Sequence, residues 1–343
     1  MAESAGTVTL PTSDGQRGMN NAIRTLSAAR HVREFSPFHE PAYQIEPGEL
    51  VRVETLCAGS GKIRQSSKAV SNAELRQKVG WSVGMPMTGP IAIAGAEPGD
   101  ALAVSIASIE FDDWGWTDVP IGQGPAGALV TEAEVRILPI RDQAIDFGFG
   151  IRLPLTPMIG AIGTAPRKRA IDSGVPEAHG GNLDCTLIRP GATLFLPVNV
   201  PGALLALGDL HAAMGDGEVG SAGLEVNGWV TLRVGLIKQT TLPLPLVDTG
   251  EVVATISSAP DLDEAAQQAV SAMVQWLATA TALGVNDAAM LISLAGDLRI
   301  CQVVDPLMTC RFEVPKSILA TLGISLSAIG LESQSMFEVE GKG

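Results

Sequence analysis

The amino-acid sequence predicts a mainly β fold followed by a smaller α+β part. Between about residues 40 and 245, short apolar runs are separated by Gly and Pro. Several breaks contain Pro-Gly, as in Glu46-Pro47-Gly48, and this pair is typical of type II turns because Gly accepts a positive φ. After residue 245 the chain becomes richer in Ala, Gln and Leu. Many short strands with regular turns favour a β-sandwich or barrel.

We divide the chain into three parts. Residues 1–22 are expected to form a polar N-terminal tail, residues 23–245 a β-rich core, and residues 246–343 an α+β part. Each expected strand of the core is an apolar run that ends at a turn signal. These runs include 50–54, 91–94, 101–109, 134–138, 193–197 and 229–236.

The C-terminal part is expected to begin with a helix over 261–283. Asp261 or Asp263 can cap its start, and Gly284 can end it in the left-handed conformation. Asn286 can then cap a second helix. The remaining expected elements are paired strands at 299–304 and 308–314, around the turn Asp305-Pro306, and a short helix at 315–322.

Composition narrows the class of protein. The chain has 343 residues, a net charge of −14 and a mean hydropathy of +0.25. The negative charge argues against nucleic acid or an anionic membrane surface as a partner. Its four cysteines form no CxxC pair, so reduced thiols in a cytoplasmic protein fit best. We expect no signal peptide and no membrane span, because no apolar run reaches the ~20 residues that a span needs.

One segment concentrates charge where apolar residues dominate. Seventeen residues of a Gly-rich, apolar stretch carry Asp209, His211, Asp216, Glu218 and Glu225. A buried carboxylate must be paired, neutralised or bound to a metal. Oxygen and imidazole ligands suit a divalent cation. In a strand, Asp209 and His211 would point to the same side. The alternative is a solvated turn beside a hydrogen-bonded core histidine.

A second cluster follows at His179-Gly180-Gly181-Asn182-Leu183-Asp184. The two glycines allow a sharp turn, so His179, Asn182 and Asp184 could converge. Asn182 could hold an amide and Asp184 could bind a metal. The alternative is a loop in which Asn and Asp bond to nearby backbone.

Two cysteines are candidate nucleophiles for an amidase. Cys185 follows the second cluster, and Cys57 lies in the segment ETLCAGSGK. The other interpretation is that both are small, buried apolar residues, since free cysteine is among the most buried residue types.

Several blocks of this sequence resemble the acetamidase/formamidase family. They are GGNLD at 180–184, LPVNVPGAL at 196–204, GDLHAAMGDGE at 208–218, GPIAIAGAEPGDALAV at 89–104 and PMIGAIGTAP at 157–166. The resemblance covers about residues 45–320. It implies a jelly-roll-like β domain with smaller α+β parts, a homo-oligomer, and hydrolysis of small amides with a divalent metal, often zinc. Relatives include stereoselective amidases and a γ-lactamase.

One position departs from the family pattern. Where this chain has Cys57, the family usually carries an Asp. If that Asp is a metal ligand, the site of this protein is changed. A thiolate at Cys57 could still bind zinc and would favour zinc over calcium or magnesium.

The leading hypothesis is a metal-assisted hydrolase of small non-peptide carboxamides, which releases a carboxylate and ammonia; a lactam or chiral amide is a possible substrate class. Asp209 and His211 would hold the metal, which we expect to be Zn²⁺ with Ca²⁺ as the alternative. Asp184 and either Cys57 or Glu225 would complete the site. Glu218 or Glu225 would act as general base, and Asn182 would orient the amide.

Two other functions stay open. One is a cysteine-dependent amidase that uses Cys57 or Cys185. The other is a non-catalytic jelly-roll module for binding or assembly. Beyond its small-molecule substrate, we expect the protein to associate as a homodimer or homotetramer, with neither nucleic acid nor membrane as a partner.

Overall fold

The computed structural model describes residues 23–80, 84–240 and 242–326. The polar tail expected at 1–22 lies outside these residues. Strands hold far more of the described chain than helices do, and the sheets do not close into a barrel. The mainly β class is therefore confirmed, while the jelly-roll topology stays a prediction.

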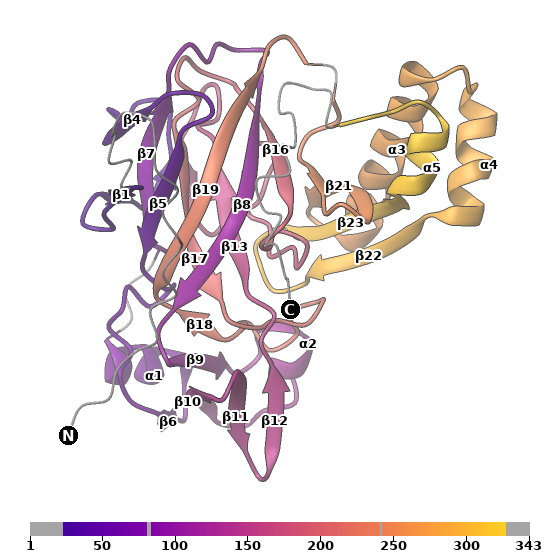
Figure 1. Cartoon of the computed structure of the whole chain (residues 1–343). Coiled ribbons are helices and arrows are strands. Elements are labelled where there is room, and N and C mark those ends of the chain that lie inside the picture. The colour runs from indigo at the N-terminus through magenta and orange to yellow at the C-terminus, as the bar shows by residue number, and fades with distance from the viewer. Residues whose placement is uncertain (1–22, 81–83, 241, 327–343) are drawn as a thin grey trace, which may run out of the picture.

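The first sheet contains the longest strands, which cross the molecule in front of the second sheet in Figure 1. β16 pairs with β20, so this sheet continues across the boundary that we expected at residue 245. That division of the chain stays a prediction. The strand order is β1 (Arg24–Leu26), β5 (Leu50–Thr55), β19 (Gly228–Ile237), β8 (Ala101–Phe111), β16 (Thr193–Pro197), β20 (Leu246–Asp248), β21 (Val252–Ala259), β23 (Met308–Pro315) and β22 (Asp297–Gln302).

The second sheet lies behind the first and carries Asp209, His211 and Glu225 on its strands. Its main path is β12 (Ile151–Pro154), β11 (Ala144–Gly148), β10 (Ala133–Arg141), β9 (Trp114–Val119), β18 (Glu225–Val226), β17 (Leu205–His211), β13 (Met158–Gly163) and β15 (Gly180–Asn182). Four further strands join it: β2 (His31–Val32), β4 (Tyr43–Ile45), β6 (Ser67–Ala69) and β7 (Met87–Ile93). A separate pair is β3 (Glu34–Phe35) with β14 (Ile171–Asp172).

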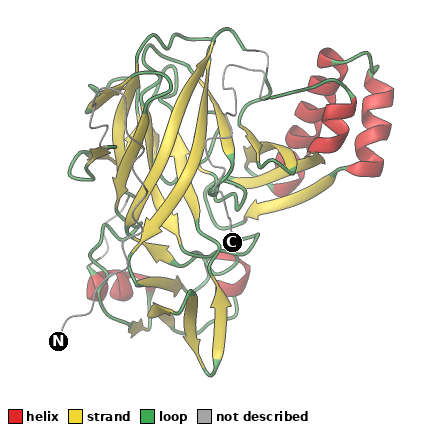
Figure 2. Ribbon diagram, in the orientation of Figure 1, coloured by secondary structure: helices red, strands yellow, loops and turns green. Residues whose placement is uncertain are grey.

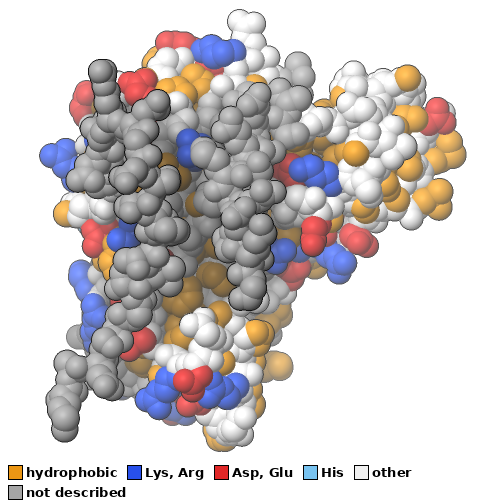
Figure 3. All heavy atoms as spheres, in the orientation of Figure 1, with side chains coloured by type: hydrophobic (Ala, Val, Ile, Leu, Met, Phe, Trp, Pro, Cys, Tyr) orange, Lys and Arg blue, Asp and Glu red, His pale blue; other side chains and the backbone are white. Residues whose placement is uncertain are grey.

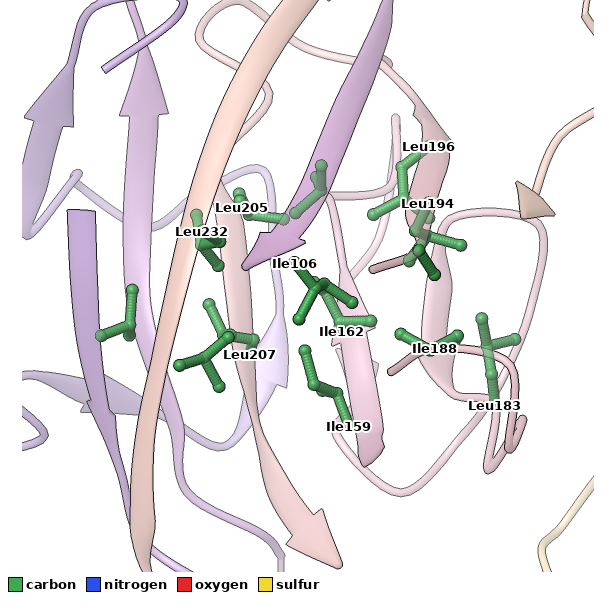
Figure 4. Packing of buried hydrophobic residues seen from close by; sticks show 14 of the residues in the cluster. Ile106, Ile159, Ile162, Leu183, Ile188, Leu194, Leu196, Leu205, Leu207 and Leu232 are labelled. Atoms are coloured by element: carbon green, nitrogen blue, oxygen red, sulfur yellow. The ribbon is translucent and has the colours of Figure 1, made fainter. Parts of the chain in front are cut away.

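The main core fills the space between these two sheets. Figure 4 shows Ile106 of β8 and Leu232 of β19 close to Leu207 of β17 and Ile159 of β13. All four side chains are buried. Apolar residues occupy consecutive positions of β17 because this strand is buried on both faces, which explains how it holds Asp209 and His211 inside the protein.

The helices lie at two ends of the molecule (Figure 2). At one end, α3, α4 and α5 pack against β21–β23 around a second core that includes Met273, Trp276 and Phe312. At the other end, α1 packs against β6 and β10. The bounds are α1 Asn72–Val79, α2 Gly124–Gly127, α3 Leu262–Ala280, α4 Val285–Ala295 and α5 Lys316–Thr321.

The Pro-Gly turns have the backbone that the sequence predicts. Gly48, Gly99 and Gly191 have φ values of 87°, 99° and 89°. In each turn the residue after the glycine donates a backbone hydrogen bond to the carbonyl three residues earlier. Only glycine adopts this conformation at little cost, so these positions fix where neighbouring strands begin.

The expected start of the long helix is confirmed and its expected end is wrong. Asp261 caps α3, since its side chain accepts a hydrogen bond from the backbone N–H of Glu264. The helix ends at Ala280, because Thr281 has extended backbone and its hydroxyl bonds back to the carbonyl of Leu277. Gly284, with φ of −76°, is the N-cap of α4 and not a left-handed C-cap, so Asn286 lies inside α4.

The helical end also presents apolar side chains to solvent. Orange side chains are visible there in Figure 3. Val285, Met290 and Leu294 of α4 are all exposed. No helix in the described ranges is long and apolar enough to cross a membrane.

A leucine-to-alanine pair tests the position of the core. Leu207→Ala removes a fully buried side chain between the sheets, so we expect the free energy of unfolding to fall by about 2–5 kcal/mol. Leu129→Ala, at a residue that is 86% exposed, should change it by less than about 0.5 kcal/mol. Urea denaturation followed by circular dichroism measures both. Equal effects of the two substitutions would contradict the assigned packing.

Candidate active site

A cavity of about 200 Å³ lies beside the second sheet and is lined by residues of β9, β17 and β18. These three strands are neighbours in the sheet (Figure 1). Acidic side chains from distant parts of the chain line it. They are Asp118, Asp172, Asp209, Glu218, Glu225 and Asp305. Asn182 and Trp116 also line the cavity, and Arg76 is the one basic residue among its described lining residues.

His211, the last residue of β17, is the centre of this acidic cluster. Its Nε2 lies 2.8 Å from Oε1 of Glu225 and 3.8 Å from Oδ2 of Asp209. On the other side of the ring, Nδ1 lies 3.9 Å from Oδ1 of Asp184. Glu225 is brought there because β18 pairs with β17 in a register that places it opposite His211. All four side chains are buried.

Several buried polar atoms of this cluster make no hydrogen bond. Both ring nitrogens of His211, both carboxylate oxygens of Asp184 and Oδ1 of Asp209 are buried and make no hydrogen bond. The contact between His211 and Glu225 is short, yet it lacks the angle of a hydrogen bond. Orphaned buried polar atoms are costly and rare in folded proteins. Atoms that crowd together without bonding to one another fit a shared cation.

Two glycines make the crowding possible. Gly160 of β13 lies opposite Asp209, and a Cβ there would come within 2.6 Å of Oδ2 of Asp209 and 2.7 Å of Oδ1 of Asp184. Gly223 packs against the imidazole, where a Cβ would lie 2.7 Å from Nδ1 of His211. Glycine at both positions therefore lets the carboxylates and the ring approach the backbone.

The backbone is strained at three acids of the site. Asp184, Asp209 and Glu218 have φ values of 43°, 57° and 45°, in the left-handed region. A non-glycine residue in this region costs of order 1 kcal/mol, and such residues concentrate at functional sites. The surrounding hydrogen bonds hold them there; for example, the backbone N–H of Asp184 donates to the carbonyl of Gly160.

Burial shifts the protonation of the acids. It raises the pKa of Asp184 to about 7 and that of Glu225 to about 8. Burial, together with the charge of Asp184, also raises the pKa of Glu218 well above its usual range. For His211, burial lowers the pKa, but the charges of Glu225 and Asp209 outweigh it and hold the pKa well above the ordinary value. Without a cation these buried carboxyl groups therefore tend to hold protons, whereas a bound cation would stabilise their charged forms.

A separate chain of hydrogen bonds brings the C-terminal part to the cavity. The side-chain amide of Asn182 donates to Oδ2 of Asp305 at 2.9 Å, which leaves Oδ1 of Asn182 buried without a partner. Asp305 lies on the loop between β22 and β23. The fully buried Gln302 orders this loop, because its Oε1 accepts from the backbone N–H groups of Val304 and Asp305.

Asp216, which sequence analysis grouped with the acids of the site, points elsewhere. Both of its oxygens accept hydrogen bonds from the guanidinium of Arg311, at 2.9 Å and 2.7 Å. Arg311 is buried on β23, and this pair joins the turn at 215–218 to the C-terminal strands. Asp216 therefore holds the turn that carries Glu218 and does not face the cavity.

Cys57 is buried close to the site but outside its ligand groups. Its thiol accepts a hydrogen bond from the indole N–H of Trp116 at 3.3 Å, and its backbone N–H donates to Asn227. Burial raises the pKa of this thiol to about 11, so it stays protonated at neutral pH. Among the described residues, the groups that can share an ion are Asp209, His211 and Glu225, and Asp184, His211 and Glu218.

Two other residues of the sequence-predicted clusters do not reach the cavity. His179 packs edge-on against Phe35, with ring centroids 4.9 Å apart, and burial lowers its pKa to about 4. Cys185 is fully buried next to Asp184. The structure thus brings Asn182, Asp184, Asp209, His211, Glu218 and Glu225 together, and leaves His179, Cys185 and Asp216 outside.

Sequence reasoning missed Asp118, Asp305 and Gly160. Asp305 was interpreted only as part of a turn, and nothing local distinguishes it from a solvated Asp-Pro turn. Asp118 follows Trp116 at a spacing of two, which on a strand predicts a shared face, and that signal could have found it. Gly160 lies in an apolar run without charge, so only its pairing with β17 reveals its role.

Comparison with known proteins places this arrangement in a family. The model of the Acetamidase/Formamidase family matches residues 25–175 and 168–321. A solved acetamidase from Bacillus halodurans is 40% identical, with a TM-score of 0.83 over 88% of this chain and 100% of that chain.

Curated relatives are more distant. A formamidase from Methylophilus methylotrophus is 27% identical, with 57% of this chain and 61% of that protein matched. An acetamidase from Mycolicibacterium smegmatis is 26% identical, with 64% of this chain and 68% of that protein matched. The chain thus spans less than two thirds of that formamidase. With the family model matching nearly all of the described chain, the protein belongs to the acetamidase/formamidase family.

Proposed function

We propose that this protein is a hydrolase of small non-peptide carboxamides that releases a carboxylate and ammonia with the help of a bound divalent cation. One observation carries the proposal: His211, Asp209 and Glu225 crowd together beside a cavity, with buried polar atoms that bond to no protein group. Family membership supports the amide as substrate, because the similar proteins are named acetamidase and formamidase.

The cation is best held on the Nε2 side of His211. Asp209 and Glu225 lie on this side and line the cavity, whereas Gly223 packs tightly against Nδ1. Asp184 faces the Nδ1 side and does not line the cavity, and Cys57 keeps its proton. Asp209, His211 and Glu225 are therefore the proposed ligands, in place of the set with Asp184 and Cys57 that we expected.

The ligand types favour zinc. Zinc binds both imidazole nitrogen and carboxylate oxygen, whereas calcium takes six to eight oxygen ligands. A divalent cation held there would supply Lewis acidity, which polarises a carbonyl oxygen and acidifies a water molecule.

Two residues of the cavity would act on the substrate. Glu218 lines the cavity outside the proposed ligand group, and the backbone N–H of Gly223 donates to its Oε1 at 3.2 Å, which fixes the carboxyl group. It would take the proton from the attacking water and return it to the leaving nitrogen. The free Oδ1 of Asn182 would accept a hydrogen bond from the amide N–H₂, while Asp305 holds the other end of the carboxamide.

The alternatives have less support. A thiol nucleophile would need access to substrate, yet neither Cys57 nor Cys185 lines the cavity. A purely structural module has no use for buried carboxylates with orphaned oxygens. The lactam substrate, the homo-oligomer, the cytoplasmic location and the jelly-roll topology remain predictions.

Metal content and activity test the proposal together. We expect protein purified without chelator to carry about one zinc ion per chain. Ammonia release from acetamide, propionamide and formamide should stop on chelation and return with zinc. His211→Gln should lose both the metal and the activity, and His39→Gln, which lies outside the cavity, should keep both. Full activity of a metal-free preparation would refute the metal-assisted mechanism.

Gly160→Ala tests whether the carboxylates converge on a cation. The added methyl group would push the carboxylates of Asp209 and Asp184 away from their positions. We expect zinc affinity to fall by about 10- to 100-fold, as for other changes that displace metal ligands. Competition with a chromophoric chelator measures it. The matched control is Gly215→Ala, where a Cβ meets no atom within 4 Å. Unchanged affinity in Gly160→Ala would argue against this site.

Thiol alkylation separates the metal mechanism from a cysteine mechanism. At pH 8, three units below the pKa of about 11, roughly one Cys57 thiol in a thousand is ionised. We therefore expect folded protein treated with iodoacetamide to keep Cys57 unmodified by peptide mass spectrometry and to retain ammonia release. The same treatment in urea should label it. Rapid labelling of the folded protein with loss of activity would instead favour the thiol nucleophile.

A further inference from the structure

A second polar feature of the cavity has no place in the proposed reaction. Asp118, on β9, is only 8% exposed and lines the same cavity as Asp209 and Glu225. Its Oδ1 is buried and makes no hydrogen bond. Because a buried carboxyl oxygen without a donor is costly, its presence in a cavity wall indicates that a ligand supplies the donor.

Strand geometry fixes where Asp118 lies relative to the proposed cation ligands. Trp116 pairs with Glu225 between β9 and β18, and Asp118 is two residues further along β9. Two strand residues span about 7 Å, and their side chains point to the same face. Asp118 thus stands a short distance along the cavity wall from the position where the amide group would bind.

The charges that line the cavity indicate which kind of hydrogen-bond donor a ligand would present to Asp118. Among the described residues that line the cavity, six have carboxyl side chains and one, Arg76, has a guanidinium group. Arg76 lies on α1, which Asn72 ties to the chain after β9 through two hydrogen bonds with the backbone of Ile121. Burial raises the pKa of Asp118 to about 7 in spite of the charge of Arg76. Oδ1 of Asp118 nevertheless accepts no hydrogen bond, and the many carboxyl groups around it favour a cationic donor.

The size of the cavity leaves room for such a group. Its volume is about 200 Å³, and a water molecule takes roughly 30 Å³ in the liquid, so about six or seven non-hydrogen atoms fit. Acetamide has four. A substrate can therefore extend from the amide toward Asp118 by a short chain.

We propose that Asp118 forms a subsite for an amino group on the acyl chain of the substrate, so that the protein prefers primary amides whose short acyl chain ends in an amine. This inference rests on the proposed amidase function and names its substrate class. The ammonium group would donate a charge-assisted hydrogen bond to Oδ1 of Asp118 while the amide occupies the space beside Asn182, Glu218 and Glu225.

Three amides of similar size test the subsite. They are 3-aminopropanamide, the isosteric neutral butanamide, and the anionic malonamate. We expect kcat/KM for 3-aminopropanamide to exceed that for butanamide by about 10- to 100-fold, the usual effect of a hydrogen bond to a charged group. Asp118→Asn should reduce this preference to about threefold or less while butanamide is still hydrolysed. Asp118→Glu, which keeps the charge, should retain part of it.

Asp113→Asn is the matched control, because Asp113 is exposed just before β9 and does not line the cavity. It should keep the full preference. Calorimetric binding of 3-aminopropanamide to wild-type protein and Asp118→Asn gives a second readout that needs no turnover. Circular dichroism verifies that each variant is folded.

The outcomes separate this inference from the proposed function. Equal rates for 3-aminopropanamide and butanamide in wild-type protein, or a preference that survives in Asp118→Asn, would overturn the subsite but leave the amidase intact. Preference for malonamate would also overturn it and assign the acyl end to Arg76. If wild-type protein with zinc hydrolyses no amide, the proposed function fails, and equal binding of 3-aminopropanamide to both proteins would then refute the subsite independently.

Discussion

The burial of His211 among carboxylates is the constraint on which the site depends. Nε2 of this histidine lies 2.8 Å from Glu225, in a part of the protein that excludes water from nearly all of these side chains. Placing several ionisable groups there costs free energy unless a cation or protons balance them. The glycines at 160 and 223, the left-handed backbone at Asp184, Asp209 and Glu218, and the strand register that sets Glu225 beside His211 all serve to bring these groups together.

Segments far apart in the sequence meet at this site. Strands of the second sheet supply the imidazole and its neighbouring carboxylates, whereas the C-terminal strands supply Asp305, held by Gln302 and bonded to Asn182. The ion pair between Asp216 and Arg311 links the turn that carries Glu218 to the same C-terminal strands. Strands β22 and β23 therefore contribute to the geometry of the cavity as well as extending the first sheet.

The sequence predicted the β class, the Pro-Gly turns and most of the clustered residues, because these depend on local signals such as a charge in an apolar run. It did not predict the end of α3, which the hydroxyl of Thr281 sets. It also could not separate Asp216 from Glu218, since the partner of Asp216 is Arg311, ninety-five residues later. Strand pairing and loop packing bring three further residues to the site: Asp118, Asp305 and Gly160. These long-range contacts leave no signal in the residues next to them in the sequence.

The most direct test of the account is anomalous diffraction at the zinc absorption edge, from crystals grown with zinc. We predict one strong peak at about 2.0–2.2 Å from Nε2 of His211 and from a carboxylate oxygen of each of Asp209 and Glu225. An empty cluster, with Nε2 of His211 in a well-aligned hydrogen bond to Glu225 and ordered water on the orphaned oxygens, would contradict the claim that these residues converge on a cation.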